Sequence, residues 1–219
     1  MSAHYELVIG SKNISSWSLR PWLAMKMAGL AFEETTVTLR QPETKERIAA
    51  LSPSGKVPAL KIAEGGKTAT VWDSLAICET LAERHKDARM WPDDPGGRAE
   101  ARSIVAEMHA GFPDLRSVLP MDIAHRHPTP ELDGKVQAQI ARVVAIWQSC
   151  LKRNGRKGGF LFGCFSLADC FYAPVVTRFE TYAIRLPPSA QAYSQRITSL
   201  LPMREWAEAA KKEAKAKTG

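Results

Sequence analysis

The sequence predicts an α/β domain followed by an all-α bundle, and three observations lead to this fold class. Residues 1–86 alternate short apolar or β-branched runs with helical patterns, in the order βαβαββα. A segment rich in proline, glycine and aspartate follows, and helical periodicity dominates beyond it. We therefore divide the chain into a first domain at 1–86, a linker at 87–97 and a helical domain at 98–219.

Two strands and two helices are predicted in the first half of the α/β domain. The apolar run Tyr5–Ile9 reads as a strand. Trp17–Ala28 has apolar residues at helical spacing, and Gly29 is placed to end that helix. Phe32–Leu39 contains four consecutive β-favouring residues and predicts a second strand, while Glu43–Leu51 predicts a short helix.

The second half of this domain predicts a hairpin and a third helix. Val57–Ile62 and Thr68–Trp72 flank a Glu-Gly-Gly-Lys turn at residues 64–67, which is a hairpin signal. Leu75–His85 has a helical apolar face, and Ser74 before it is a suitable N-cap.

Helical patterns account for the rest of the chain. The run Met90–Gly97, dense in Pro, Gly and Asp, predicts the interdomain connection. The expected helices beyond it are Arg98–Ile123, bent near Pro113, then Pro130–Asn154, Leu167–Thr181, a shorter helix starting at Pro187-Pro188, and Leu201–Lys212.

Composition excludes several classes of protein. Of the 219 residues, 45% are apolar, which is enough for a packed core. We find no membrane-length apolar run and no signal-peptide pattern, and expect a cytoplasmic protein without a membrane partner. The four cysteines form no Cys-x-x-Cys pair, so neither a disulfide framework nor a metal site is expected from Cys78, Cys150, Cys164 and Cys170.

The formal net charge of +7 raises the question of an anionic partner. Part of the excess lies in the tail Lys211–Lys217, which has no interleaved aromatic residues and reads as a solvated helix end. We therefore expect no nucleic acid partner.

The dipeptide Val57-Pro58 opens the third predicted strand. Proline cannot donate to a sheet, but it makes a cis peptide bond accessible. A cis bond here would turn Val57 outward, so that its backbone N–H and C=O could pair with an extended peptide. This dipeptide therefore predicts both a fold and a type of ligand.

Hydroxyl groups precede two of the predicted helices, and each group has two interpretations. Ser15 and Ser16 could cap the helix that follows them, or donate to a thiolate held at its N-terminus. Asp73 and Ser74 could likewise act as caps, or bind an ammonium and a carboxylate. The amino-acid end of a peptide carries both of those groups.

Four segments of this chain together resemble the glutathione S-transferase family. They are residues 15–20, 55–60 and 73–77, in matching order and spacing, and the helix-start signature Phe165-Ser166-Leu167-Ala168-Asp169. The resemblance implies a thioredoxin-like domain followed by an all-helical domain. We interpret Ser166 and Asp169 as a capping box that serves folding.

The resemblance also implies roles for individual residues. Ser15 stands where serine-type, zeta-like and tau-like classes place the hydroxyl that activates the thiol, with Ser16 as the alternative. Lys56 would lie near the glycine carboxylate of glutathione, and Val57, beside Pro58, would hold the cysteinyl backbone. Asp73 and Ser74 would take the γ-glutamyl end.

The second-substrate pocket is expected on the long helix after the linker. By position alone the candidates are Met108, Phe112, Met121 and Arg126, although such a Met/Phe set is also typical of a helical core. His109 is interpreted as a packing or capping histidine, without metal-ligating partners.

We therefore expect a homodimeric transferase that conjugates the glutathione thiolate to small hydrophobic electrophiles, with no metal and no prosthetic group. One alternative is a glutathione-dependent isomerase similar to maleylacetoacetate isomerase. Trp17 argues against it, since zeta-like enzymes usually carry cysteine two places after the serine. Two further alternatives are a non-catalytic regulator and a ligand-carrying protein on the same fold.

Overall fold

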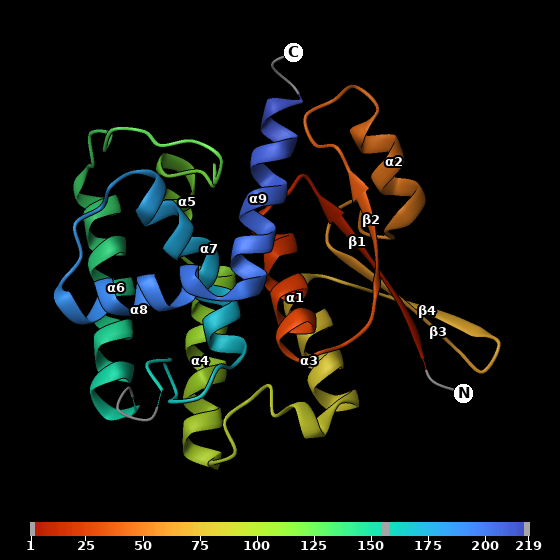
Figure 1. Cartoon of the computed structure of the whole chain (residues 1–219), viewed down its shortest axis with the longest axis horizontal. Helices are drawn as coiled ribbons and strands as arrows, with labels where there is room; N and C mark the ends of the chain where they lie inside the picture. Colours follow the sequence, from red (N-terminus) through yellow and green to blue (C-terminus); the bar gives the residue numbers. More distant parts are fainter. Residues whose placement is uncertain (1–2, 155–157, 217–219) are drawn as a thin grey trace.

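The structure is a computed structural model that describes residues 3–154 and 158–216 (Figure 1). Its first half has the predicted order βαβαββα, which confirms the α/β prediction. The elements are β1 (His4–Gly10), α1 (Ser16–Met27), β2 (Glu33–Val37), α2 (Thr44–Leu51), β3 (Ala59–Glu64), β4 (Lys67–Trp72) and α3 (Ser74–Arg84).

The four strands form one sheet in the order β2-β1-β3-β4. β1 runs parallel to β2 and antiparallel to β3, and β3 is antiparallel to β4. In the register, Val8 is opposite Ala59, and Ala59 is opposite Trp72. The ends of β1 and β4 and the start of β3 therefore share one edge of the sheet, which brings three of the predicted binding segments to one place.

The two faces of the sheet are covered differently. α1 and α3 lie between the sheet and the helical half, and α2 packs on the far side (Figure 1). Ile48 of α2 joins a small cluster with Val8, Val37 and Ala59. The larger core lies on the α1 side, where Trp22 is fully buried. This layering leaves the N-terminus of α1 at the junction with the helices.

The second half is helical throughout its regular structure, as predicted. A short 3₁₀ turn (Lys86–Ala88) precedes α4 (Pro95–Ala110), α5 (Pro113–Val118), α6 (Gly134–Asn154), α7 (Leu167–Thr181), α8 (Pro188–Ser199) and α9 (Leu201–Lys215). α7 is the central helix, because it packs against α1, α4 and α8, and almost all of its residues are buried. None of the described helices is both long and apolar enough to cross a membrane.

The predicted single helix Arg98–Ile123 is wrong. α4 begins earlier, at Pro95, and ends at Ala110. The next residues break the helix, because Phe112 adopts a left-handed backbone with φ of 59°. α5 then ends at Val118, and an irregular segment follows up to α6. A bend at Pro113 could not accommodate a left-handed residue, so two helices form in place of one.

Two helix starts also differ from the predictions. Asp73, rather than Ser74, is the N-cap of α3, and its carboxylate accepts hydrogen bonds from the N–H groups of Leu75 (2.8 Å) and Ala76 (3.3 Å). α6 begins four residues later than expected, where the Asp133 carboxylate accepts from the N–H of Val136. In both cases a carboxylate satisfies the first free N–H groups of the helix.

The capping box at the start of α7 is confirmed. The fully buried Asp169 carboxylate accepts from the N–H of Ser166 (2.9 Å) and of Leu161 (3.2 Å), and from the hydroxyl of Tyr193 (3.1 Å). Burial raises the pKa of Asp169 to about 6, in opposition to these hydrogen bonds. The predicted basic tail is helical as far as Lys215, while Lys217 lies outside the described residues.

Candidate active site

The Val57-Pro58 peptide bond is cis, as predicted. Val57 is half-buried and lies two residues before the start of β3, at the sheet edge where β1 and β4 end. Its backbone forms no hydrogen bond within the part of the chain that the structure describes. The Lys56 side chain beside it is exposed. A peptide could therefore pair with Val57 without displacing an internal bond.

Ser15 and Ser18 form a buried hydrogen-bonded pair at the start of α1. The Ser15 hydroxyl donates to Oγ of Ser18 across 2.7 Å, and this Oγ also accepts from the N–H of Gly10 at 3.0 Å. Ser15 is at the N-cap position, but its side chain caps no N–H of α1. The capping interpretation is therefore wrong for Ser15, and the first turn of α1 keeps N–H groups that can face an anion.

Ser16, the alternative hydroxyl, has a different partner. Its Oγ accepts from a guanidinium N–H of Arg178 at 3.1 Å. Arg178 comes from α7 and also donates to the carbonyl oxygens of Leu119 and Arg116. Ser16 thus joins the first turn of α1 to the central helix of the other half.

Arg20 connects α1 to the start of α3. Its guanidinium lies 3.3 Å from Oγ of Ser74 and is fully buried. The guanidinium carbon also lies 4.2 Å from the ring centroid of Trp17 and 4.7 Å from that of Phe171. Nε of Arg20 has no hydrogen-bond partner in the described structure. Ser74 is therefore held close to the first two turns of α1.

His109, on α4 of the helical half, reaches the place where the N-terminal ends of α1 and α3 meet. We call this region, around Ser15, Ser16 and Ser74, the corner. Nε2 of His109 lies 3.4 Å from a carboxylate oxygen of Asp73, and its ring meets Trp17 edge-on with centroids 5.1 Å apart. Burial lowers the pKa of His109, with repulsion from Arg20 and Arg116 adding to the effect, while the Asp73 carboxylate acts in the opposite direction. The predicted packing role of His109 thus includes contacts with two residues of the candidate site.

Three arginines, Arg20, Arg116 and Arg178, give this corner its charge. Burial lowers the pKa of all three, to about 9 for Arg20 and about 10 for Arg178, and repulsion from Arg116 adds to the effect in both. In residues 3–154 and 158–216, none of the three has a carboxylate oxygen within 4.0 Å. The corner therefore carries positive charge without a directly paired counter-charge, which favours an anionic ligand.

The four residues predicted for the second-substrate pocket are not brought together. Met108, Phe112 and Met121 are buried in the main hydrophobic core. Arg126 is exposed, pairs with Glu180 at 2.5 Å, and lines a cavity of about 310 Å³ between the loop after α5 and helices α7 to α9. A pocket role for this set remains a prediction, and the burial of the first three residues favours the core interpretation.

Sequence patterns do not predict Ser18, Arg20, Arg116 or Arg178 as site residues, and they assign His109 a packing or capping role only. A signal existed for two of them. Arg20 and Arg178 are charged residues within helices whose other residues are mostly apolar, and a buried arginine needs polar partners. Ser18 and Arg116 gave no such signal, because their roles depend on neighbours that are distant in the sequence.

Comparison with known families identifies the class of protein that this fold and corner define. Residues 14–84 match the model described as glutathione S-transferase, N-terminal domain, and residues 95–209 match glutathione S-transferase, C-terminal domain. The chain belongs to the glutathione S-transferase family, and its first domain is thioredoxin-like, as the resemblance implied.

Several relatives within this family are named maleylacetoacetate isomerase. The chain is 35% identical to maleylacetoacetate isomerase of Mus musculus over 180 residues, which is 79% of this chain and 77% of that protein. It is 33% identical to the probable maleylacetoacetate isomerase of Caenorhabditis elegans over 111 residues, 51% of this chain, and so spans about half the length of that relative (49%).

A solved structure of a maleylacetoacetate isomerase is also similar to this chain. Maleylacetoacetate isomerase from Anaeromyxobacter dehalogenans, with glutathione bound in its active site, matches with a TM-score of 0.68 and 25% identity, over 94% of this chain and 95% of that one. These relatives support the isomerase alternative more strongly than the transferase prediction, although Trp17 stands where zeta-like enzymes usually carry cysteine.

Proposed function

We propose that this protein is a glutathione-dependent isomerase whose substrate is a conjugated cis-enone acid of the maleylacetoacetate type. Glutathione is the co-substrate. Three arginines at or beside the first two turns of α1, none of them with a carboxylate oxygen within 4.0 Å in the described structure, carry the proposal, because they suit an electrophile with carboxylates. The maleylacetoacetate isomerases among the relatives support it.

Glutathione would lie along the sheet edge where β1 and β4 end. Val57 would pair with its cysteinyl backbone, Asp73 and Ser74 would hold the γ-glutamyl ammonium and carboxylate, and exposed Lys56 would meet the glycine carboxylate. The unpaired backbone of Val57 supports this placement. The Arg20 guanidinium would reinforce Ser74 as a carboxylate partner.

The thiol would be activated at Ser15. Oγ of Ser18 accepts from the N–H of Gly10, and the Ser18 hydroxyl can turn to donate its own O–H to Oγ of Ser15. The Ser15 O–H then becomes free to donate to the sulfur. This hydrogen bond and the N-terminus of α1 both favour the thiolate, and so lower the thiol pKa from its usual value of about 8.5.

Isomerisation would need no net change in glutathione. The thiolate adds to one carbon of the cis double bond, which forms a C–S bond and moves an electron pair onto the conjugated carbonyl as an enolate. Rotation about the resulting single bond follows, and expulsion of the thiolate restores the double bond in its trans form. Arg116 and Arg178 would hold the substrate carboxylates and stabilise the enolate charge.

A second candidate is the transferase predicted from the sequence. Trp17 favours it, because this residue stands where zeta-like isomerases usually carry a cysteine. The two activities are distinguished by supplying reduced glutathione with maleylacetoacetate, and separately with an aryl halide. We expect trans product from the first with glutathione unconsumed, and slow or no thioether formation from the second. Rapid thioether formation without isomerisation would favour the transferase.

A non-catalytic role predicts a different result. A regulator would give neither product and would not be retained on immobilised glutathione, while a ligand carrier would bind apolar anions without turnover. We expect retention of the wild type and loss of retention by Ser74→Ala. Failure of both proteins to bind would contradict the glutathione assignment.

The protein is also proposed to be a homodimer, with the first domain of one subunit against the helical domain of its partner. Trp72, at the end of the sheet-edge strand β4, is 46% exposed and is a candidate contact. Light scattering with size-exclusion chromatography tests this, and a monomeric mass at micromolar concentration would contradict it.

A further inference from the structure

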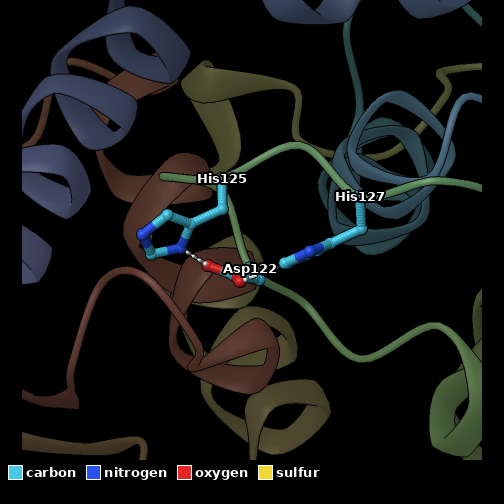
Figure 2. A group of neighbouring side chains, drawn as sticks. All are labelled: Asp122, His125 and His127. Atoms are coloured by element: carbon cyan, nitrogen blue, oxygen red, sulfur yellow. Dashed lines mark hydrogen bonds and ion pairs between the residues drawn. The ribbon is translucent and has the colours of Figure 1, made fainter.

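Asp122, His125 and His127 lie together in the segment between α5 and α6, and none of them has a part in the proposed reaction (Figure 2). One carboxylate oxygen lies 2.8 Å from Nδ1 of His125, and the other lies 2.7 Å from Nε2 of His127. The candidate ligand atoms of the three residues all lie within 4.8 Å of one another. One carboxylate thus faces two imidazole nitrogens.

We propose that Asp122, His125 and His127 form a binding site for a divalent transition-metal ion of the Zn²⁺ type. Two imidazole nitrogens and one carboxylate oxygen are ligands that such ions prefer. Bonds of about 2.0–2.1 Å in a tetrahedral site place ligand atoms about 3.3 Å apart. The two Asp–His pairs, which use different carboxylate oxygens, lie at 2.7 and 2.8 Å, and all the ligand atoms lie within 4.8 Å of one another, so side-chain shifts of about 0.5–1.5 Å would bring three ligands onto one ion. A water molecule would complete the coordination.

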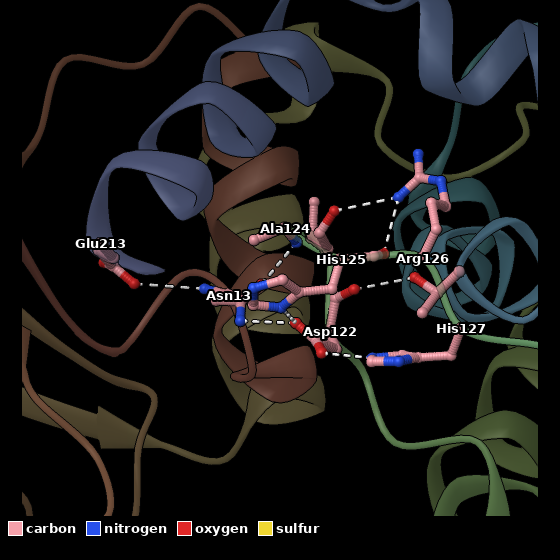
Figure 3. Close-up of polar contacts among 9 residues, drawn as sticks. Asn13, Asp122, Ala124, His125, Arg126, His127 and Glu213 are labelled. Carbon is pink, nitrogen blue, oxygen red and sulfur yellow. Dashed lines mark hydrogen bonds and ion pairs between the residues drawn. The ribbon is translucent and has the colours of Figure 1, made fainter. Parts of the chain in front are cut away.

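Asn13 fixes the site from one side (Figure 3). Its side-chain amide donates to the Asp122 carboxylate at 2.8 Å and accepts from the N–H of Ala124 at 2.8 Å. Its own backbone carbonyl accepts from the N–H of Ile123 at 3.3 Å. One ligand is therefore oriented by a second residue, as is usual for metal-binding carboxylates.

The end of α7 fixes the site from the other side. The N–H of His127 donates to the carbonyl oxygen of Thr181 at 2.9 Å, and the Thr181 hydroxyl donates to the carbonyl oxygen of Asp122 at 3.0 Å. The His127 ring stacks on Tyr182 with centroids 5.4 Å apart. Since two of the three ligands are already held by contacts with α7, little conformational entropy is lost when an ion binds.

The neighbouring cation does not compete for the carboxylate. Arg126 lies between the two histidines in the sequence, but its guanidinium donates to the carbonyls of Ile123 and His125 (Figure 3). It also pairs with the carboxylate of Glu180. In each neutral imidazole the proton can reside on the ring nitrogen that faces away from Asp122. The three ligands can therefore bind an ion without breaking an arginine–carboxylate pair.

Calorimetric titration of ZnCl₂ into untagged, EDTA-treated and dialysed full-length protein tests the site. We expect one equivalent bound at micromolar protein concentration, and affinity about 100-fold lower in His125→Ala/His127→Ala. His4→Ala is the matched control, because His4 is exposed and pairs with a glutamate in the same way. Cys164→Ser removes the exposed thiol and should leave binding unchanged.

A second readout keeps the test independent of folding. Asp122→Asn keeps the shape of the side chain and the Asn13 contact geometry, and should also weaken Zn²⁺ binding, while urea unfolding curves show whether each variant is folded. The wild type should gain thermal stability with Zn²⁺ and the double variant should not. Equal affinity in wild type and double variant, binding at millimolar Zn²⁺ only, or loss of binding in Cys164→Ser would overturn the proposal.

Discussion

The hydroxyl of Ser15 donates to Oγ of Ser18 across 2.7 Å, one turn further along α1. Ser18 is itself held by the N–H of Gly10, the last residue of β1. The hydroxyl proposed to activate glutathione is therefore positioned by a second serine and by the end of the first strand. A bond between two hydroxyl groups can reverse its direction, which leaves the Ser15 proton available to a sulfur atom.

Replacement of Ser15 by alanine should remove the hydrogen bond to the thiolate. We expect turnover to fall by about 100-fold or more, with glutathione binding largely kept, because the lost interaction is with the charged sulfur. The pKa of the bound thiol, followed by thiolate absorbance, should rise. Ser16→Ala is the comparison variant, and an active Ser15→Ala beside an inactive Ser16→Ala would contradict the assignment.

Ser18→Ala should act through Ser15. The substitution leaves the N–H of Gly10 without its acceptor and Ser15 without its partner, so we expect a loss of about 1–3 kcal/mol in the free energy of unfolding. Turnover should fall, and the pKa of the bound thiol should rise, by less than in Ser15→Ala. Ser103→Ala on the exposed face of α4 is the control. An unchanged thiol pKa would show that Ser18 has a structural role only.

Arg116→Gln should distinguish acidic from neutral electrophiles. Arg116 is half-buried, and its guanidinium carbon lies 5.4 Å from the ring centroid of Trp17 in the proposed site. We expect KM for maleylacetoacetate to rise by about tenfold, the cost of one charged contact of about 1.4 kcal/mol, while rates with a neutral ester change little. Arg47→Gln, on the exposed surface of α2, should behave as wild type. Equal effects on acid and ester would argue against carboxylate recognition.

His109 should make stability depend on pH. Its pKa is lowered in the folded protein, chiefly by burial, so the unfolded chain binds more protons between the folded value and about 6.5. The free energy of unfolding should therefore be highest above about pH 6.5 and fall as the pH decreases through the folded pKa. Urea unfolding of wild type and His109→Gln measures this, with His4→Gln as the control. The slope should be smaller in His109→Gln, and identical slopes would contradict the prediction.

Local patterns predicted most of the regular structure. Trp17–Ala28 and Leu167–Thr181 were recognised as helices because apolar spacing and start or stop residues agree, and the α7 helix has the predicted bounds. Prediction failed after Ala110, where a left-handed Phe112 ends the helix pattern. Aromatic residues rarely adopt that conformation, so only the surrounding packing could impose it.

The residues of the candidate site likewise divide into those that local patterns predicted and those that they did not. Ser15, Val57 and Asp73-Ser74 were found because each lies at the start or end of a predicted element, where a backbone or a hydroxyl is free to bind. The arginines and Ser18 were missed because their partners come from other elements. Arg178, for example, meets Ser16 across 162 positions of sequence.

The sequence by itself determined the βαβαββα order, the helical second half, the cis Val57-Pro58 bond and the family, because these depend on local spacing and on motifs in a set order. Only the tertiary structure decided which charged side chains lie together at the corner around Ser15, Ser16 and Ser74. Arg20, Arg116, Arg178 and His109 converge there from four helices, α1, α5, α7 and α4, and the sheet register brings the ends of β1 and β4 to one edge of the sheet. The side chains that meet in space are set by packing between elements, which spacing along the chain does not encode.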